Sequence, residues 1–191
     1  DDARALVASR KAVATCSTSE GASTAAFVSK MLAVPMSAVQ GMIGVGDSVF
    51  LGFGRVYSGV LREGDKMYVI NGAYDPSQPE DGACEEVVIE ELYLMMGQGM
   101  FRVKEVPAGN VLAIGGLEKY VLKSATLSST KMCPPFGNMM FQVAPIVKVA
   151  VEPENVSDMP ALVEGLRLLN RSDAFVEVGL METGVPRQLL R

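Results

Sequence analysis

The chain has 191 residues, of which 49% are hydrophobic and 20% charged, and its formal net charge at pH 7 is −5. This length allows one large or two small domains, and the apolar content argues against extensive disorder. The acidic balance argues against nucleic-acid binding by overall charge, so any RNA contact must come from a few local basic side chains.

The residue types also limit the chemistry. Histidine is absent, and the three cysteines, Cys16, Cys84 and Cys133, are widely spaced. His-dependent catalysis is therefore excluded and no zinc-binding pattern is present, so we interpret the cysteines as reduced thiols. The sequence has no run of about 18 apolar residues and does not open with a signal-peptide pattern. We expect a cytoplasmic, monomeric protein without membrane contact.

A helix and a strand are predicted first in chain order. Residues 1–15 have helical composition, and residues 17–23 form a linker of small residues. Residues 27–34 predict a strand, and the Gly-rich residues 35–48 predict a loop. Because the helical segment begins abruptly, we expect residues 1–26 to be the end of a preceding domain and a linker.

The most informative run is FGRVYSGVLREGDKMYVI, at residues 53–70. Two β-rich segments, 53–61 and 66–70, flank a polar turn at 62–65 in which Gly64 can take positive φ. We therefore predict a β-hairpin, in which the two segments pair across the turn.

Two glycines lie inside the first of these segments. Gly54 and Gly59 weaken a flat strand, so they indicate bulges or sharp bends. Bent strands joined by short turns suit a small closed barrel, because closure requires coiled strands and leaves no edge. We expect residues 27–140 to form such a barrel.

Further short elements are expected to complete this barrel. Residues 124–130 are rich in small hydroxyl side chains, which we assign to its rim. The remaining predictions are a loop at 71–82, a strand at 87–96, a return at 98–104, a polar turn at 105–110 and a buried strand at 111–114.

The pattern changes near residues 139–141, where we place a domain boundary. An amphipathic helix is predicted at 158–170, because apolar residues recur there at spacings of three and four. Ser157 is the expected N-cap, and Pro160 is tolerated in the first turn, where its missing N–H has no partner to lose. Strands are predicted on either side of this helix, at 144–151 and 175–181.

Several short motifs in one order resemble a known protein family. The run GRVYSGVLREGDK at 54–66 is similar to a strand–turn–strand of the second domain of translational GTPases. CPPF at 133–136 and AVEP at 150–153 favour the branch of elongation factor-like GTPases that act in large-subunit maturation. The motifs that narrow the resemblance to the elongation factor 2 group are LYLMMG at 92–97, EVPAGN at 105–110 and LEKYVLKSATLSST at 117–130.

This resemblance implies a mainly β fold. It predicts a closed antiparallel translation-factor barrel at 27–140, followed by half of a ferredoxin-like α+β domain at 141–191. In such a domain the third strand lies between the first two. Pro186 would interrupt that third strand, so we expect only strand–helix–strand. Residues 1–26 would be the end of the preceding GTPase domain.

The resemblance also implies a function. The full protein would be a GTPase that releases the anti-association initiation factor from the 60S ribosomal subunit, together with the Shwachman–Bodian–Diamond syndrome protein. GTP and Mg would be bound in the missing preceding domain, because no Gly-x-x-x-x-Gly-Lys-Ser/Thr motif occurs in this sequence. This chain itself would hold no catalytic, cofactor or metal residues and would bind partners and relay conformational change.

Four basic residues are the candidate contacts with the ribosome or with a neighbouring domain. Arg55, Arg62 and Lys66 surround the central run, and Lys123 follows a short apolar segment. Basic side chains at a barrel rim can pair with RNA phosphates without reading bases. We interpret the paired acids as a solvated face rather than as general acid and base; they lie at 80–81, 85–86 and 90–91.

Two other functions stay open. The first is the elongation factor 2 translocase itself, against which the motifs at 123–130 and 133–136 speak. The second is a free-standing β-barrel adaptor for RNA or protein, or the related spliceosomal GTPase. An upstream phosphate-binding loop would argue against the adaptor.

Overall fold

The computed structural model describes residues 2–19, 21–41, 48–77, 84–97, 99–137, 149–173, 176, 178–180 and 188–190. The chain divides into two compact units, Asp1–Asn138 and Met139–Arg191, and each is described by itself. The boundary expected at 139–141 and residues 78–82 of the loop expected at 71–82 lie outside the described residues, as do residues 42–47 of the expected Gly-rich loop. Within the described part, no helix is both long and apolar enough to cross a membrane.

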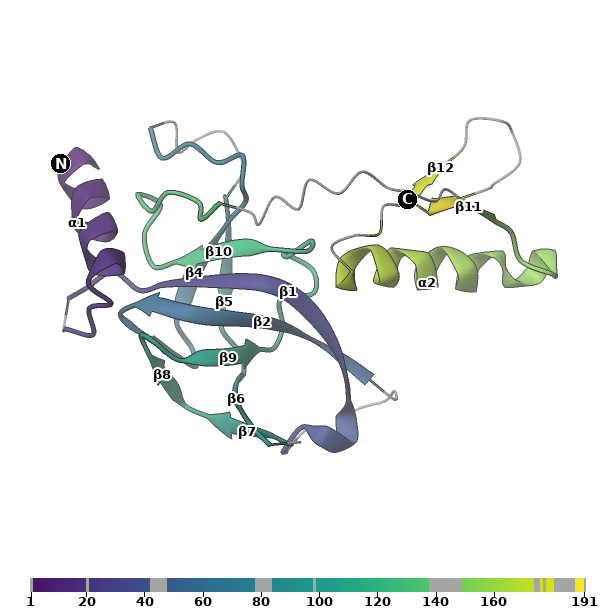
Figure 1. The fold of residues 1–191 in the computed structure, drawn as a ribbon, viewed down its shortest axis with the longest axis horizontal. Coiled ribbons are helices and arrows are strands. Elements are labelled where there is room, and N and C mark those ends of the chain that lie inside the picture. The colour runs from purple at the N-terminus through teal and green to yellow at the C-terminus, as the bar shows by residue number, and fades with distance from the viewer. Residues whose placement is uncertain are drawn as a thin grey trace. The chain divides into compact units, whose positions relative to one another are not determined.

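The first unit is built around one large antiparallel sheet (Figure 1). Its eight strands follow the order β5-β4-β10-β1-β2-β9-β6-β7, and β3 and β8 form a separate ribbon. A helix, α1 (Asp2–Ala14), precedes the sheet as predicted. The strands are β1 (Ala25–Pro35), β2 (Ser48–Ser58), β3 (Val60–Arg62), β4 (Lys66–Ile70), β5 (Cys84–Val88), β6 (Leu92–Met96), β7 (Gly99–Val103), β8 (Glu105–Pro107), β9 (Val111–Ile114) and β10 (Ala125–Ser128).

The mainly β fold is confirmed, whereas closure of the barrel stays a prediction. Among the described residues the large sheet has two ends, β5 and β7, which do not pair with each other. Backbone hydrogen bonds nevertheless join the turn after β3 to the segments that follow β5 and β7, the two end strands of the sheet. The Gly64 N–H donates to the Ile89 carbonyl over 2.8 Å, and the Glu63 N–H donates to the Lys104 carbonyl over 3.0 Å.

The predicted hairpin at 53–70 is wrong, although its turn is present. Gly64 has a φ of +86°, as expected for this tight turn. However, β3 pairs with β8, and β4 pairs with β5 and β10, so the strands on either side of the turn do not pair with each other. The reason is that Ile89 bonds both Gly64 and Asp65 through its backbone, so the turn binds the segment after β5.

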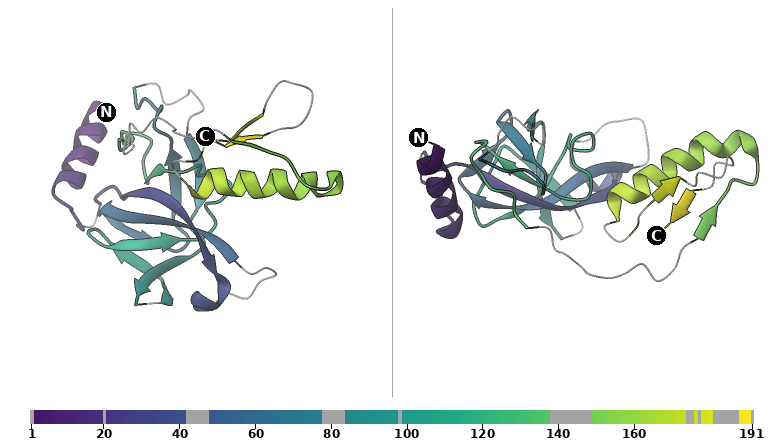
Figure 2. Two further views of the ribbon diagram at one scale, coloured as in Figure 1. Left: turned by 45° about the vertical axis from the view of Figure 1, so that its right-hand side comes forward. Right: turned by 90° about the horizontal axis from the view of Figure 1, so that it is seen from above.

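The two glycines of β2 do mark irregularities. The register between β1 and β2 shifts between Val28 and Lys30, opposite Gly54. A Cβ on Gly54 would collide with the carbonyl oxygen of Phe27, so only glycine fits this close approach. Gly59, with a φ of +73°, separates β2 from β3. The long strands β1 and β2 are visibly curved (Figure 2).

Other sequence predictions need correction. The single strand expected at 87–96 is two strands. β5 pairs with β4, β6 pairs with β9 and β7, and residues 89–91 between them are not in a strand. The rim expected at residues 124–130 is wrong for its centre, since β10 lies between β4 and β1 and all four of its residues are buried. Its hydroxyls have backbone partners: Thr126 accepts from the Phe136 N–H. The return at 98–104 is strand β7, and the turn at 105–110 begins with strand β8.

Apolar side chains pack on both faces of the large sheet. The main cluster lies on one face and includes Val56, Leu92, Leu112 and Leu127. Because side chains alternate along a strand, the residues next to these in each strand point to the opposite face of the sheet. Two smaller clusters cover parts of that second face. One contains Val34, Val39, Leu51, Tyr93 and Ala113. The other contains Ala25, Ile70, Tyr74 and Cys133.

The second unit contains three strands and one helix. Its antiparallel sheet has the order β11-β13-β12, formed by β11 (Val149–Val151), β12 (Val178–Leu180) and β13 (Gln188–Leu190). The sequence predicted only strand–helix–strand, so the third strand is a correction. This strand, β13, begins two residues after Pro186, so every residue of β13 keeps its backbone N–H for pairing. Pro186 lies outside the described residues, as do parts of the strands expected at 144–151 and 175–181.

The helix of this unit, α2 (Met159–Ser172), is confirmed in place but not in its cap. Asp158 is the N-cap and makes no side-chain capping bond. Ser157 lies instead in a preceding 3-10 turn, η2 (Val156–Asp158), which shifts the helix start by one residue. Pro160 lies in the first turn, as predicted.

Candidate interaction surface and the Arg102 cluster

The four predicted contact residues have different surroundings. Arg62 pairs with Glu105 at 3.0 Å, and Lys66 pairs with Glu86 at 3.4 Å, so a carboxylate balances each charge locally. Lys123 adopts a φ of +72° after β9, in the turn before β10. Arg55 differs from Arg62 and Lys66, because its guanidinium lies over an aromatic ring rather than beside a carboxylate.

Arg55 belongs to a row of outward side chains on β2. Phe53, Arg55 and Tyr57 alternate with the buried Gly54 and Val56, so they point away from the main apolar cluster. The Arg55 Cζ lies 5.6 Å from the centre of the Tyr57 ring, within cation–π distance.

Neighbouring segments extend this row. The Lys30 ammonium of β1 lies 5.8 Å from the centre of the Phe53 ring. Phe136 packs edge-on against Tyr57 at 5.1 Å and against Phe27 at 6.0 Å between ring centres. We call the six residues Phe27, Lys30, Phe53, Arg55, Tyr57 and Phe136 the cation–aromatic strip.

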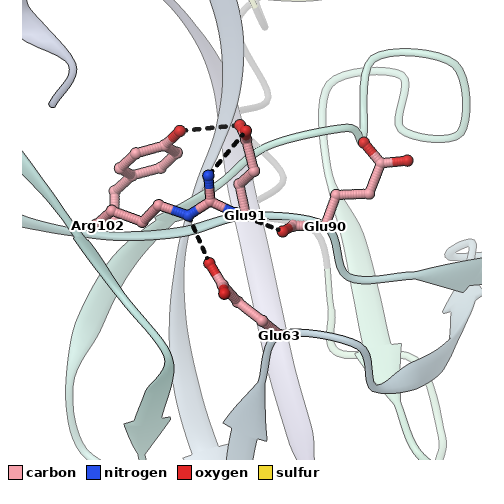
Figure 3. Close-up of polar contacts among 5 residues, drawn as sticks. Glu63, Glu90, Glu91 and Arg102 are labelled. Atoms are coloured by element: carbon pink, nitrogen blue, oxygen red, sulfur yellow. Dashed lines mark hydrogen bonds and ion pairs between the residues drawn. The ribbon is translucent and has the colours of Figure 1, made fainter. Parts of the chain in front are cut away.

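A second group of charges gathers around Arg102 of β7 (Figure 3). Its Nε donates to Glu63 Oε1 at 2.8 Å, and its Nη1 lies 3.5 Å from Glu91 Oε1. Its Nη2 donates to the backbone carbonyl of Glu90 at 3.4 Å, and the Glu90 carboxylate points elsewhere. The Tyr93 hydroxyl donates to the second Glu91 oxygen at 2.8 Å. We call Glu63, Glu91, Tyr93 and Arg102 the Arg102 cluster.

The cluster shifts the protonation equilibria of two of its members. Burial raises the pKa of Tyr93 to about 12, and the hydrogen bond to the negative Glu91 carboxylate adds to the shift. The hydrogen bond to Glu63 raises the pKa of Arg102 further. Both shifts favour the forms that make the observed contacts, the neutral Tyr93 hydroxyl and the charged Arg102 guanidinium.

Side chains that could act as nucleophiles are hydrogen-bonded to the backbone or partly buried. The Ser58 hydroxyl donates to the Ser23 carbonyl at 2.7 Å, and Ser29 donates to the Phe53 carbonyl at 3.2 Å. Burial raises the pKa of the Cys84 thiol, which disfavours the reactive thiolate. Within the residues that the structure covers, no three His, Cys, Asp or Glu side chains are placed to hold a metal ion.

The paired acids separate into different roles. Glu85 and Glu86 are exposed on β5, as a solvated face requires, and Glu86 pairs with Lys66. Glu91 was also assigned to a solvated face, and that is wrong, because it bridges Arg102 and Tyr93. The pair at 80–81 lies outside the described residues.

The sequence alone did not predict most residues of the cation–aromatic strip or of the Arg102 cluster. The alternation Phe53-x-Arg55-x-Tyr57 was a usable signal for part of the strip, since it places two rings and a cation on one strand face. Arg102 and Glu63 are 39 positions apart. No local pattern indicates that pairing.

Comparison with known proteins finds relatives that align with most of this chain. Residues 49–128 match the family model of the elongation factor Tu domain 2. The chain is 46% identical over 151 residues to elongation factor-like GTPase 1 of Homo sapiens, and 44% identical over 154 residues to that of Mus musculus. It is 44% identical over 136 residues to ribosome assembly protein 1 of Schizosaccharomyces pombe. Each match covers 71% of this chain but only 13–14% of the relative.

Proposed function

Because the chain belongs with the elongation factor-like GTPases and carries an elongation factor Tu domain 2 at residues 49–128, we propose that it serves a ribosome-associated GTPase as a non-catalytic binding module. The observation that carries this proposal is the combined match: the relatives align along most of this chain, and the family model coincides with β2 to β10. GTP hydrolysis would occur in another domain of the parent protein, because this sequence lacks the phosphate-binding loop.

The proposed domain boundaries follow from the similarity to elongation factor-like GTPases. Residues 1–26 end the GTPase domain, residues 27–140 form the second domain, and residues 141–191 belong to the third. We propose that the second domain closes as a barrel through the β3–β8 ribbon. The backbone bonds of Gly64 and Glu63 support this, because they join that end of the ribbon to the segments after β5 and β7.

The proposed setting is assembly of the large ribosomal subunit. The name of the Schizosaccharomyces pombe relative supports ribosome assembly over the translocase and over a free-standing adaptor. In this setting the parent GTPase releases the anti-association factor from the 60S subunit in the cytoplasm, together with the Shwachman–Bodian–Diamond syndrome protein. The module transmits the nucleotide-dependent movement and contributes part of the ribosome contact, with Arg55, Arg62, Lys66 and Lys123 as candidates.

Sedimentation tests whether the chain is a ribosome-binding module. The 191-residue chain is mixed with purified large subunits, or separately with small subunits, at low or at high salt, and each mixture is sedimented through sucrose at that salt concentration. We expect recovery with large subunits at low salt and loss at high salt, since phosphate contacts weaken with salt. Equal recovery with both subunits, or none with either, would overturn the proposal.

A further inference from the structure

Carboxylate side chains are distributed unevenly over the strands of the large sheet. Its four adjacent strands β10, β1, β2 and β9 contain no Asp or Glu, although the chain has 22 acidic residues and a net charge of −5. Figure 1 shows these strands side by side. The same strands carry two cations, Lys30 and Arg55. Acidic side chains of this unit occur instead on β5 and β8, around the Arg102 cluster, and in turns and loops, for example at Asp65, Asp75 and Glu118.

The cation–aromatic strip is the uncovered part of this acid-free region. Along the outer face of β2, Leu51 is fully buried under the cluster that includes Val34 and Val39. Past Leu51, Phe53 and Tyr57 are half-buried and Arg55 is exposed. Phe136 closes the other end, where the cluster around Cys133 begins. The strip therefore lies between two covered patches, with rings and cations accessible together.

We propose that the cation–aromatic strip binds unpaired nucleotides of RNA. This rests on the proposed function and identifies which face of the module meets the ribosome. Base rings stack on aromatic side chains and on arginine planes, while Lys30 and Arg55 attract the phosphates. The absence of carboxylates on the four strands lowers the local repulsion that an acidic protein otherwise presents to a polyanion.

Unpaired RNA fits this strip better than a duplex or an acidic peptide does. The bases of an RNA duplex are stacked inside the helix, where half-buried side chains of a sheet cannot reach their faces. An acidic peptide would pair with the two cations but would leave the rings of Phe53 and Tyr57 without a planar partner. These rings are separated by about 13 Å along the strand, which spans more than one nucleotide.

Fluorescence anisotropy with a labelled ten-nucleotide uridine RNA tests the proposal on the full 191-residue chain. We expect saturable binding that weakens with salt. Tyr57→Leu, which removes a stacking ring but keeps apolar packing, should weaken binding about fivefold or more. Arg55→Gln and Lys30→Gln should each weaken it several-fold and reduce the salt dependence. The matched control Lys104→Gln removes the same charge from an exposed site next to β7, outside the strip, and should change affinity less than twofold.

The outcomes separate this proposal from the function it rests on. Equal losses in the strip and control variants, equal affinity for an RNA duplex or for a ten-residue glutamate peptide, or no binding of the oligonucleotide would each overturn the strip assignment. If Arg55→Gln and Tyr57→Leu still sediment with large subunits like the unmodified chain, the strip fails while the module proposal stands. Thermal unfolding of every variant checks that the substitutions preserve the fold.

Discussion

The Arg102 guanidinium lies 2.8 Å from the Glu63 carboxylate and thereby joins β7 to the turn after β3, across 39 positions of sequence. This pair lies where the large sheet ends in β7. Through Glu91 the same guanidinium also holds Tyr93 of β6. The Arg102 cluster is thus a side-chain connection between the end of the sheet and the β3 turn.

Removing Arg102 should destabilise the first unit modestly. Exposed ion pairs contribute up to about 1 kcal/mol, and Arg102 is 44% exposed, so Arg102→Gln should cost about 1 kcal/mol in the free energy of unfolding. Urea denaturation measures this. A double-mutant cycle with Glu63→Gln should give a positive coupling energy, whereas Lys104→Gln is the control for charge loss on the same segment. Strict additivity of the two substitutions would refute the connection.

Tyr93 should make the protein lose stability at alkaline pH. Its pKa is about 12 in the folded chain against an ordinary 10.0, so folding favours the neutral phenol. That contribution is complete below pH 10 and is lost as pH rises towards 12, because the unfolded chain ionises first. The loss amounts to about 2–3 kcal/mol.

Tyr93→Phe should flatten this decline between about pH 10 and about pH 12 in urea denaturation, at the cost of about 1 kcal/mol near pH 7 from the lost hydrogen bond. Tyr57→Phe is the control for a half-buried tyrosine. An unchanged slope in Tyr93→Phe would show that another group causes the alkaline loss.

Two glycines of the same run should respond differently to alanine. At Gly54 the added Cβ meets the Phe27 carbonyl oxygen, a backbone atom that cannot move aside, so Gly54→Ala should cost more than about 2 kcal/mol. At Gly64 the space is open and only the φ of +86° is unfavourable, so Gly64→Ala should cost about 1 kcal/mol. Thermal and urea denaturation of both variants compare them. A reversed order would contradict the close approach of β1 and β2.

The second unit should be less stable than the first. Its helix α2 leaves Val163 and Leu169 about 40% exposed, and Leu166 is the one residue of this helix in the buried apolar core of the described chain. Native-state hydrogen exchange should therefore show faster exchange in α2 and β12 than in β1 and β2. Equal protection in the two units would refute this prediction.

The chain should not bind GTP. Its sequence offers no backbone cradle for a β-phosphate, so calorimetric titration with GTP and Mg²⁺ should give no saturable heat at micromolar concentrations. A micromolar dissociation constant would require a nucleotide site of another kind and would contradict the proposed non-catalytic role.

Local signals in the sequence located most elements but not their partners. The helical stripe predicted α2, and the apolar run at 111–114 predicted β9. The turn at 62–65 was also predicted correctly, since Gly64 and its polar neighbours act over four residues. The pairing partners of β3 and β4, the strands on either side of this turn, were not predicted. The partners of β3 on β8 lie 43 to 47 positions away in the sequence, and those of β4 lie 14 to 22 positions away on β5 and 56 to 60 on β10.

For the candidate sites too, the sequence identified single residues but not the residues that they contact. Arg55 was a sequence candidate and does lie on an accessible face, but Arg62 and Lys66 are paired with carboxylates that the sequence did not connect to them. Phe136 joined the strip only because the chain returns to β1 and β2 after β10. The role of Arg55 in binding remains a prediction.

By itself the sequence determined the kinds of elements, the missing phosphate loop and the absence of histidine, because these depend on residue identity and on spacings within one strand or helix. Only the tertiary structure decided that four acid-free strands lie side by side, and that Arg102 reaches Glu63. Both relations depend on which distant strands compete successfully for each other's backbone hydrogen bonds, and that competition is settled by packing of the whole sheet.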